Sequence, residues 1–143
     1  MGLYDPIAKR PGIDGGSTGC YAFEFLDDYI TFNTCDGTNC FHCRGGKLEC
    51  GRWYHVAGVY DGTNLICYLN GRPGEPVPAS VVLSTHEPLY IGSGVSDPDR
   101  IYNGLIDELA VYDRALSASE IKALYDAGVA GKSPSPETRA GVR

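Results

Sequence analysis

The sequence predicts an all-β protein, an antiparallel β-sandwich that ends in one short C-terminal helix. Two observations lead to this fold class. Runs of aromatic and β-branched residues, each bounded by Gly, Asn, Asp or Pro, recur along the chain and are typical of short strands. Near the C-terminus Ser117 stands three residues before Glu120, a spacing that marks the start of a helix. The 143 residues are enough for one domain with a single core.

The clearest strands form a hairpin within residues 52–71, RWYHVAGVYDGTNLICYLNG. Asp61-Gly62 and Asn70-Gly71 tolerate the positive φ angles of tight turns, so each strand has its own boundary. Alternate residues of the first strand are mostly apolar or aromatic on both faces, which is the pattern of a sandwich-core strand covered on both sides. One face holds Trp53, His55, Ala57 and Val59, and the other holds Tyr54, Val56, Gly58 and Tyr60.

Three segments precede this hairpin. Residues 1–19 contain two Pro and five Gly and predict an irregular entry segment. Residues 20–32, CYAFEFLDDYITF, alternate aromatic with other side chains around Asp27-Asp28, so they predict a hairpin of two short strands. Residues 33–51 are polar and Gly-rich and hold four of the six cysteines. We expect this last segment to be a Cys-rich insertion held in place by disulfides.

The segment after the central hairpin begins with a Pro-rich connection. Residues 72–78 carry three Pro, and because Pro lacks a ladder donor they cannot be an interior strand. Residues 81–83 and 89–92 predict two short strands, and residues 93–100 predict a loop. Residues 102–112 predict a last long strand, since apolar residues alternate on both of its faces.

The C-terminal helix follows directly. Ser117 and Glu120 form a capping box, and Leu116 with Ile121 can form the hydrophobic staple. Gly128 stands where a left-handed cap belongs, which predicts a helix of about nine or ten residues. Such a short helix is not stable alone, so we expect it to lie against the sandwich. Residues 132–143 predict a linker or free tail.

Composition excludes several classes of protein. A net charge of −6 and a pI near 4.9 argue against nucleic acid as a partner. No apolar run is long enough for membrane insertion, and no signal peptide is recognisable. Six cysteines in one small domain nevertheless favour an oxidising compartment. We therefore expect an extracellular or secreted domain that is part of a larger chain.

Four blocks of sequence carry a resemblance to a known family. WYHVAGVYDG, ICYLNGR, LYIGSG and NGLIDELAVYDRALSASEIKALYDAG, taken in order, resemble laminin-G-like members of the concanavalin A-like lectin and glucanase superfamily. The last block is also similar to the closing segment of pentraxins. The resemblance covers residues 53–128 and implies a jelly-roll domain over residues 20–131 whose early strands are missing or unrecognisable. It also implies binding of carbohydrate or protein, sometimes through calcium.

The same resemblance suggests ligand-binding residues. Residues 93–100 stand where pentraxin relatives carry an acidic metal loop, so Asp97 and Asp99, with Asp107, are candidate calcium ligands. Tyr102 lies beside that loop, and a tyrosine ring can stack on a sugar. Asp97, Asp99 and Tyr102 are therefore the candidate ligand-binding residues. The alternative is a solvated turn with a core tyrosine.

The cysteines allow three interpretations. Six cysteines can pair into disulfides in 15 ways, and the sequence does not choose among them. The spacing also leaves open a zinc site, because Cys40 and Cys43 have the spacing of a common half-site, and the C-x₄-C-x₂-C spacing resembles the start of an iron–sulfur pattern. The disulfide candidates are Cys20, Cys35, Cys40, Cys43, Cys50 and Cys67.

Catalytic residues are harder to find. Glycoside hydrolysis needs two facing carboxyl groups, but Asp107 and Glu108 would point to opposite faces of one strand. We therefore expect a non-catalytic binding module of an extracellular multidomain protein that recognises carbohydrate or protein. The alternative is a structural or assembly domain, a possible homo-oligomer that associates through an uncompleted sheet edge. A zinc-dependent or glycoside-hydrolysing enzyme is a third hypothesis.

Overall fold

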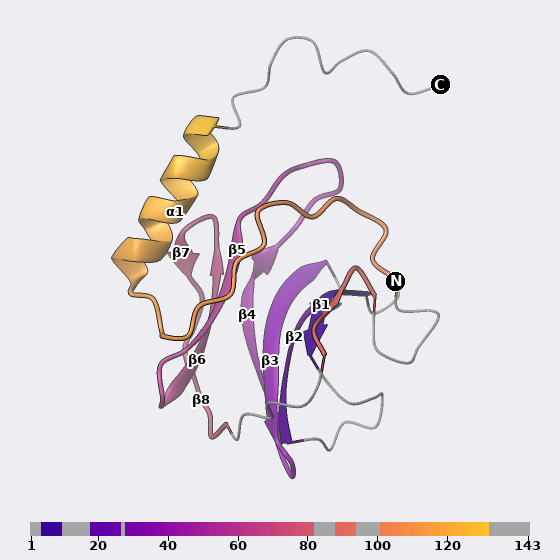
Figure 1. The fold of residues 1–143 in the computed structure, drawn as a ribbon, viewed down its shortest axis with the longest axis vertical. Helices are drawn as coiled ribbons and strands as arrows, with labels where there is room; N and C mark the ends of the chain where they lie inside the picture. Colours follow the sequence, from indigo (N-terminus) through magenta and orange to yellow (C-terminus); the bar gives the residue numbers. More distant parts are fainter. Residues whose placement is uncertain (1–3, 10–17, 27, 82–87, 94–100, 132–143) are drawn as a thin grey trace.

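The structure, a computed structural model, describes residues 4–9, 18–26, 28–81, 88–93 and 101–131. Two antiparallel sheets and one helix make up this part of the chain (Figure 1). The first sheet has the strand order β4-β3-β2-β1-β9 and the second is built around β5-β6-β7, with β8 also paired to β6. The predicted all-β sandwich with one helix is confirmed. No helix among the described residues is long and apolar enough to cross a membrane.

The first sheet begins with β1 (Tyr4–Lys9), β2 (Thr18–Leu26) and β3 (Tyr29–Asp36). The predicted hairpin around residues 27–28 is confirmed, since β2 pairs with β3 in antiparallel register. The irregular segment expected over residues 1–19 is wrong for β1, which pairs with β2 on one side and with β9 (Tyr90–Ile91) on the other. The pairing of β1 with β9 joins segments about 80 positions apart, a contact that local alternation in the sequence does not reveal.

The expected Cys-rich insertion at residues 33–51 is also wrong. β3 continues to Asp36, and β4 (Cys40–Lys47) pairs with it along its length. The Asp36 carboxylate accepts hydrogen bonds from the amides of Thr38 (2.9 Å) and Asn39 (2.7 Å), which closes a tight turn between the two strands. The glycines that made this stretch look irregular are needed instead for close packing against the second sheet, because a Cβ at Gly45 or Gly46 would press on side chains of β6.

The second sheet contains the predicted central hairpin, with strands β5 (Val56–Tyr60) and β6 (Asn64–Leu69). Its turn is held by the Asp61 carboxylate, which accepts from the amides of Thr63 (2.8 Å) and Asn64 (2.7 Å), and Gly62 has a φ of 97°. These hydrogen bonds lower the pKa of Asp61. Trp53 differs from the prediction, because it precedes the strand and is 56% exposed.

Residues 72–78 are a surface connection with two short strands at its ends. β7 (Arg72–Pro73) and β8 (Val77–Pro78) each pair with β6, and Pro73 and Pro78 lie on outer strands where a missing donor is tolerated. Of the two short strands predicted further on, β9 confirms the one at residues 89–92. Residues 82 and 83, like Asp97, Asp99, His86 and residues 132–143, lie outside the described residues, so the tail and the domain limits stay predictions.

The core lies between the two sheets. Its buried members are Ile30 and Phe32 from β3, Cys43 from β4, and Leu65 with Cys67 from β6. The ring of Phe32 fills the space opposite Gly58 of β5, where a Cβ would overlap it. Because β5 packs Val59 outward and Val56 inward, both of its faces are covered, as the alternation predicted.

The outer face of the second sheet is covered by α1 (Ala118–Gly131). Ile121 of the helix is fully buried against Val59 and Tyr68, with Leu116 packed beside it, so the predicted staple and docking are confirmed. The capping box is also confirmed, because the Ser117 amide donates to Glu120 (2.8 Å) and the Glu120 amide donates to the Ser117 hydroxyl (3.3 Å).

The end of the helix differs from the prediction. The helix is 14 residues long and passes through Gly128. Gly128 is absent from the described glycines with positive φ. Glycine permits a left-handed cap but does not impose one, and here the helical hydrogen bonds continue past it.

The predicted strand over residues 102–112 is wrong. At its start a bridge joins Ser93 to Ile101, and the Tyr102 amide donates to the carbonyl of Gly92. Beyond them, residues 103–112 contain no strand. Glu108 has a φ of 52°, which bends the chain in the middle of the alternating run. A strand pattern needs a neighbouring strand to complete its hydrogen bonds, and the described part of the chain provides none here.

The helix cap predicts a defined pH dependence of stability. Arg114 binds the Glu120 carboxylate, and the amide and hydroxyl of Ser117 also donate to it, so the pKa of Glu120 falls from an ordinary 4.5 to about 2. A carboxylate whose pKa is lower in the folded than in the unfolded protein stabilises the fold at pH values above its unfolded pKa. This stabilisation is lost as the pH falls through the folded pKa. Glu120→Gln should therefore lower the urea midpoint at pH 7, and its difference from wild type should shrink between about pH 4.5 and 2. Glu75→Gln, an exposed carboxylate, is the control. A difference independent of pH would contradict this account.

Candidate binding surface

The most unusual surface of the described chain is a run of exposed apolar side chains between β9 and α1. We call it the apolar strip, and its members are Ile101, Leu105, Ile106, Leu109, Val111 and Tyr112. Figure 1 shows the segment in orange, as a coil that leads from the region of β1 to α1. Leu105 is 75% exposed and Val111 66% exposed. Single exposed apolar residues are normal, but several gathered in twelve consecutive residues indicate an interaction surface.

The backbone of the strip, like its side chains, is not part of either sheet over residues 103–112. Residues 103–112 form no ladder, so the polar groups of an otherwise strand-like sequence are not taken up by a sheet. In the second sheet β5 is a terminal strand, and among the described residues only β6 pairs with it, so its other edge has no described partner. Open edges of this kind can accept a strand from another chain.

The ring of Tyr102 packs against neighbouring residues of the protein. Its ring stacks on Phe25, with 5.6 Å between the ring centroids and 5° between the planes. Gly104 lies close against the same ring, and a Cβ at that position would overlap it. With contacts from both Phe25 and Gly104, the ring has less free surface for stacking on a sugar than the sequence suggested. Binding at Tyr102 stays a prediction.

Of the three candidate calcium ligands, the described part of the chain contains Asp107. Asp97 and Asp99 lie outside the described residues. The Asp107 carboxylate accepts a hydrogen bond from the Glu108 amide at 2.8 Å, a local contact that supports the bend at Glu108. Within the described ranges no group of three or more His, Cys, Asp or Glu side chains is placed to hold a metal ion. Calcium therefore stays a prediction that depends on Asp97 and Asp99.

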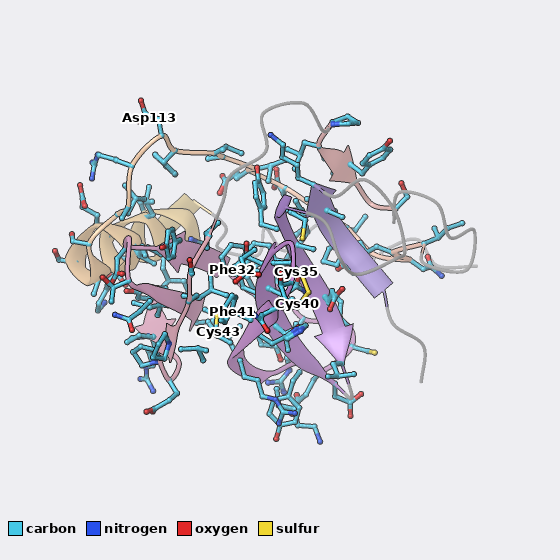
Figure 2. The ribbon with its side chains drawn as sticks, turned by 90° about the horizontal axis from the view of Figure 1, so that it is seen from below. Phe32, Cys35, Cys40, Phe41, Cys43 and Asp113 are labelled. Carbon is cyan, nitrogen blue, oxygen red and sulfur yellow. A yellow bond between two sulfur atoms is a disulfide. The ribbon has the colours of Figure 1, made fainter. Side chains whose placement is uncertain are left out.

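The cysteines are distributed over both sheets and both faces. Cys35 and Cys40 form a disulfide across the β3–β4 hairpin, and Figure 2 shows its yellow bond between the two strands. Cys43 points into the core instead, because residues three apart in a strand lie on opposite faces. Cys20 and Cys67 are buried and Cys50 is exposed. A zinc site of Cys35, Cys40, Cys43 and Cys50 is therefore wrong for this structure.

The histidines do not form a catalytic arrangement in the described chain. His55 lies just before β5 with its ring 6.0 Å from that of Tyr125, and its amide donates to Asn70 at 3.0 Å. His42 is exposed on β4. These contacts hold the half-buried His55 beside the start of β5.

Comparison with known proteins agrees with the sandwich geometry. Residues 7–122 match a laminin-G-type family model that is described as the concanavalin A-like lectin/glucanases superfamily. The chain belongs to this superfamily. The resemblance seen in the four sequence blocks is thereby confirmed, and it extends to β1, which the blocks did not include. Superfamily membership establishes the fold but leaves the ligand open.

One solved structure adds a more distant similarity. An S-layer domain-containing protein from Clostridium thermocellum (residues 221–444) is 27% identical and superposes with a TM-score of 0.44. The alignment covers 79% of this chain and 59% of that one. No curated protein matches the chain.

The packing of Tyr102 against Gly104 can be tested directly. Gly104→Ala places a Cβ where the ring now lies, so Tyr102 should move off Phe25 and the protein should lose about 1 to 2 kcal/mol of stability. Thermal unfolding and near-ultraviolet circular dichroism of the tyrosines are the measurements. The exposed neighbour Asn103→Ala should leave both unchanged. If Gly104→Ala has the same melting temperature as the wild type, the ring of Tyr102 is not held between Phe25 and Gly104.

Proposed function

We propose that this chain is a non-catalytic binding module of an extracellular, multidomain protein, and that it recognises another protein through the apolar strip. The observation that carries the proposal is the exposure of Leu105, Leu109 and Val111, which lie together on a segment that forms no strand with the described residues. Burying an exposed Leu or Val contributes about 1.5 to 3 kcal/mol, and a few such side chains at the centre of an interface dominate its affinity.

The chemistry of the strip favours protein over carbohydrate. Sugars are bound by flat aromatic faces together with groups that form hydrogen bonds. The strip is mainly aliphatic, and its one aromatic member is Tyr112. Tyr102, the aromatic candidate beside it, is already in contact with Phe25 and Gly104. A partner that supplies apolar side chains and backbone hydrogen bonds matches the strip better.

The extracellular assignment rests on the disulfide. Cys35 and Cys40 are joined across a hairpin, and stable disulfides of this kind are typical of oxidising compartments. The laminin-G-type family of the chain is consistent with such a location. The non-catalytic assignment agrees with the hydrogen bond that the Asp107 carboxylate accepts from the Glu108 amide, a contact that supports a bend in the chain.

Parallel binding screens test the proposal. The full chain is applied to an array of extracellular proteins and to a glycan array, each with calcium and with EDTA. We expect binding on the protein array that falls at least tenfold in Leu105→Gln/Val111→Gln, since two buried side chains are worth more than 1.4 kcal/mol. Leu124→Gln, at a helix residue about as exposed as Leu109, is the matched control and should bind like wild type.

The other outcomes are equally informative. Glycan binding that is unaffected by Leu105→Gln/Val111→Gln would show that the strip is not the binding surface. It would also indicate that the ligand is a carbohydrate. Loss of binding with EDTA would support a calcium site that includes Asp97 and Asp99. Equal loss in the Leu124→Gln control would mean that the variants act through stability.

A second candidate function is assembly of the chain with itself. The open edge of β5 and the strand-like sequence of residues 103–112 favour it, because a strand from a second copy would complete the missing hydrogen bonds. Sedimentation velocity over a range of concentrations should then show a dimer or larger species. Ala110→Lys places a charge in the strip and should give a monomer, while Ala123→Lys on the exposed face of α1 should not. A wild-type monomer at every concentration would exclude this function.

A further inference from the structure

Two cysteines face each other across the sandwich core. Cys43 lies on β4 of the first sheet and Cys67 lies on β6 of the second sheet, and both belong to the same buried cluster. Their exposed fractions are 1% and 0%. They are 24 positions apart in the sequence and lie on strands that are not paired with each other. Figure 2 shows Cys43 beside Phe41 and Phe32, on the side of the hairpin away from the Cys35–Cys40 bond.

The two thiols are in direct contact. The Cys67 thiol donates a hydrogen bond to the Cys43 sulfur, and the Cys43 thiol donates to the carbonyl of Phe32 at 3.4 Å. The contact lowers the pKa of Cys43 and, together with burial, raises that of Cys67, as expected when one thiol donates to the other. The pair therefore acts as one unit inside the core.

The backbones of the two sheets come unusually close at this point. A Cβ at Gly45 would lie 2.7 Å from the Cys67 sulfur, and a Cβ at Gly74 would overlap the carbonyl of Arg44. Facing sheets normally lie about 10 Å apart, whereas a disulfide requires Cα atoms within about 7 Å. Glycine at both positions removes the side chains that would keep the strands apart, so the geometry allows a bridge here.

We propose that Cys43 and Cys67 form an inter-sheet disulfide in the protein as it exists outside the cell. The oxidant is a second disulfide, either of a small thiol compound or of a thiol–disulfide oxidoreductase. The Cys43 thiolate attacks that disulfide and forms a mixed disulfide, releasing one thiolate. The Cys67 thiolate then attacks the Cys43 sulfur and releases the second. Two protons leave the protein, and the two electrons reduce the incoming disulfide to two thiols.

Because both cysteines are buried in the folded protein, the oxidation must take place before the two sheets pack together. With both sulfurs almost fully buried, the oxidant reaches them only while the two sheets are apart, and the finished bond is then protected from reductants. The bond would join the two sheets covalently at a point where the described chain otherwise holds them by packing alone. The Cys35–Cys40 bond is different, because it joins neighbouring strands of one hairpin.

The direct test is a map of the disulfides. The full chain is refolded with reduced and oxidised glutathione, denatured, and its remaining thiols are blocked with iodoacetamide without reduction. Cleavage after Phe41 separates Cys40 from Cys43, so mass spectrometry can assign each bond. We expect a cross-linked species that joins the segment of Cys43 to that of Cys67, in wild type and equally in the control Cys20→Ala. Alkylated Cys43 and Cys67 beside an intact Cys35–Cys40 bond, or Cys43 linked to any other cysteine, would overturn the proposal.

A stability measurement gives an independent answer. In Cys35→Ala/Cys40→Ala the proposed bond is retained. Protein that is reduced in denaturant and refolded in reductant should melt about 10 °C below the oxidised form, because the unfolded chain regains the entropy of a loop of this length. In Cys43→Ala/Cys67→Ala the corresponding shift should be only about 6 °C, because the remaining Cys35–Cys40 bond closes a shorter loop. A melting temperature of the first variant that does not respond to reductant would overturn the proposal, whatever the stability of the second.

Discussion

The close approach of the two sheets is the constraint on which the rest of the structure depends. It is made possible by glycines that stand where a side chain would collide with the other sheet. Gly58 leaves room for the ring of Phe32, and Gly45 leaves room for Cys67. Because protein interiors tolerate few voids, each of these glycines is matched by a larger neighbour that fills the space it leaves. The sandwich core is therefore thin and dense, and the two buried thiols meet inside it.

The second sheet divides its side chains between two cores. One face of β5 and β6 packs against the first sheet, while Val59 and Tyr68 on the other face pack against α1. The helix is attached by local chemistry, with Arg114 and Ser117 holding Glu120 at its first turn. The segment that leads to α1 pairs with neither sheet over residues 103–112 in the described part of the chain. The apolar strip is the result, and its exposure makes it the surface most suited to a partner.

The sequence anticipated the site less well than the fold. Alternation over residues 102–112 predicted a strand that the structure does not form, because the pattern does not say whether a partner strand is present. Tyr102 was singled out for its place beside an acidic loop, yet its ring packs on Phe25 and Gly104. Both differences have one cause, since side-chain exposure depends on distant segments that local spacing does not describe. The strip was not identified as an interaction surface from the sequence; the number of apolar residues between positions 101 and 112 is the signal that could have indicated it.

The sequence by itself determined the fold class, the central hairpin and the capped helix, because turns, caps and alternation depend on residues a few positions apart. Tertiary structure alone decided the place of β1, the strand character of the cysteine-rich stretch and the pairing of its thiols. These features depend on contacts between segments far apart in the chain. Cys40 and Cys43 show the difference clearly. Their spacing suggested one metal site, but a strand sends side chains three positions apart to opposite faces, so one joins a hairpin disulfide and the other enters the core.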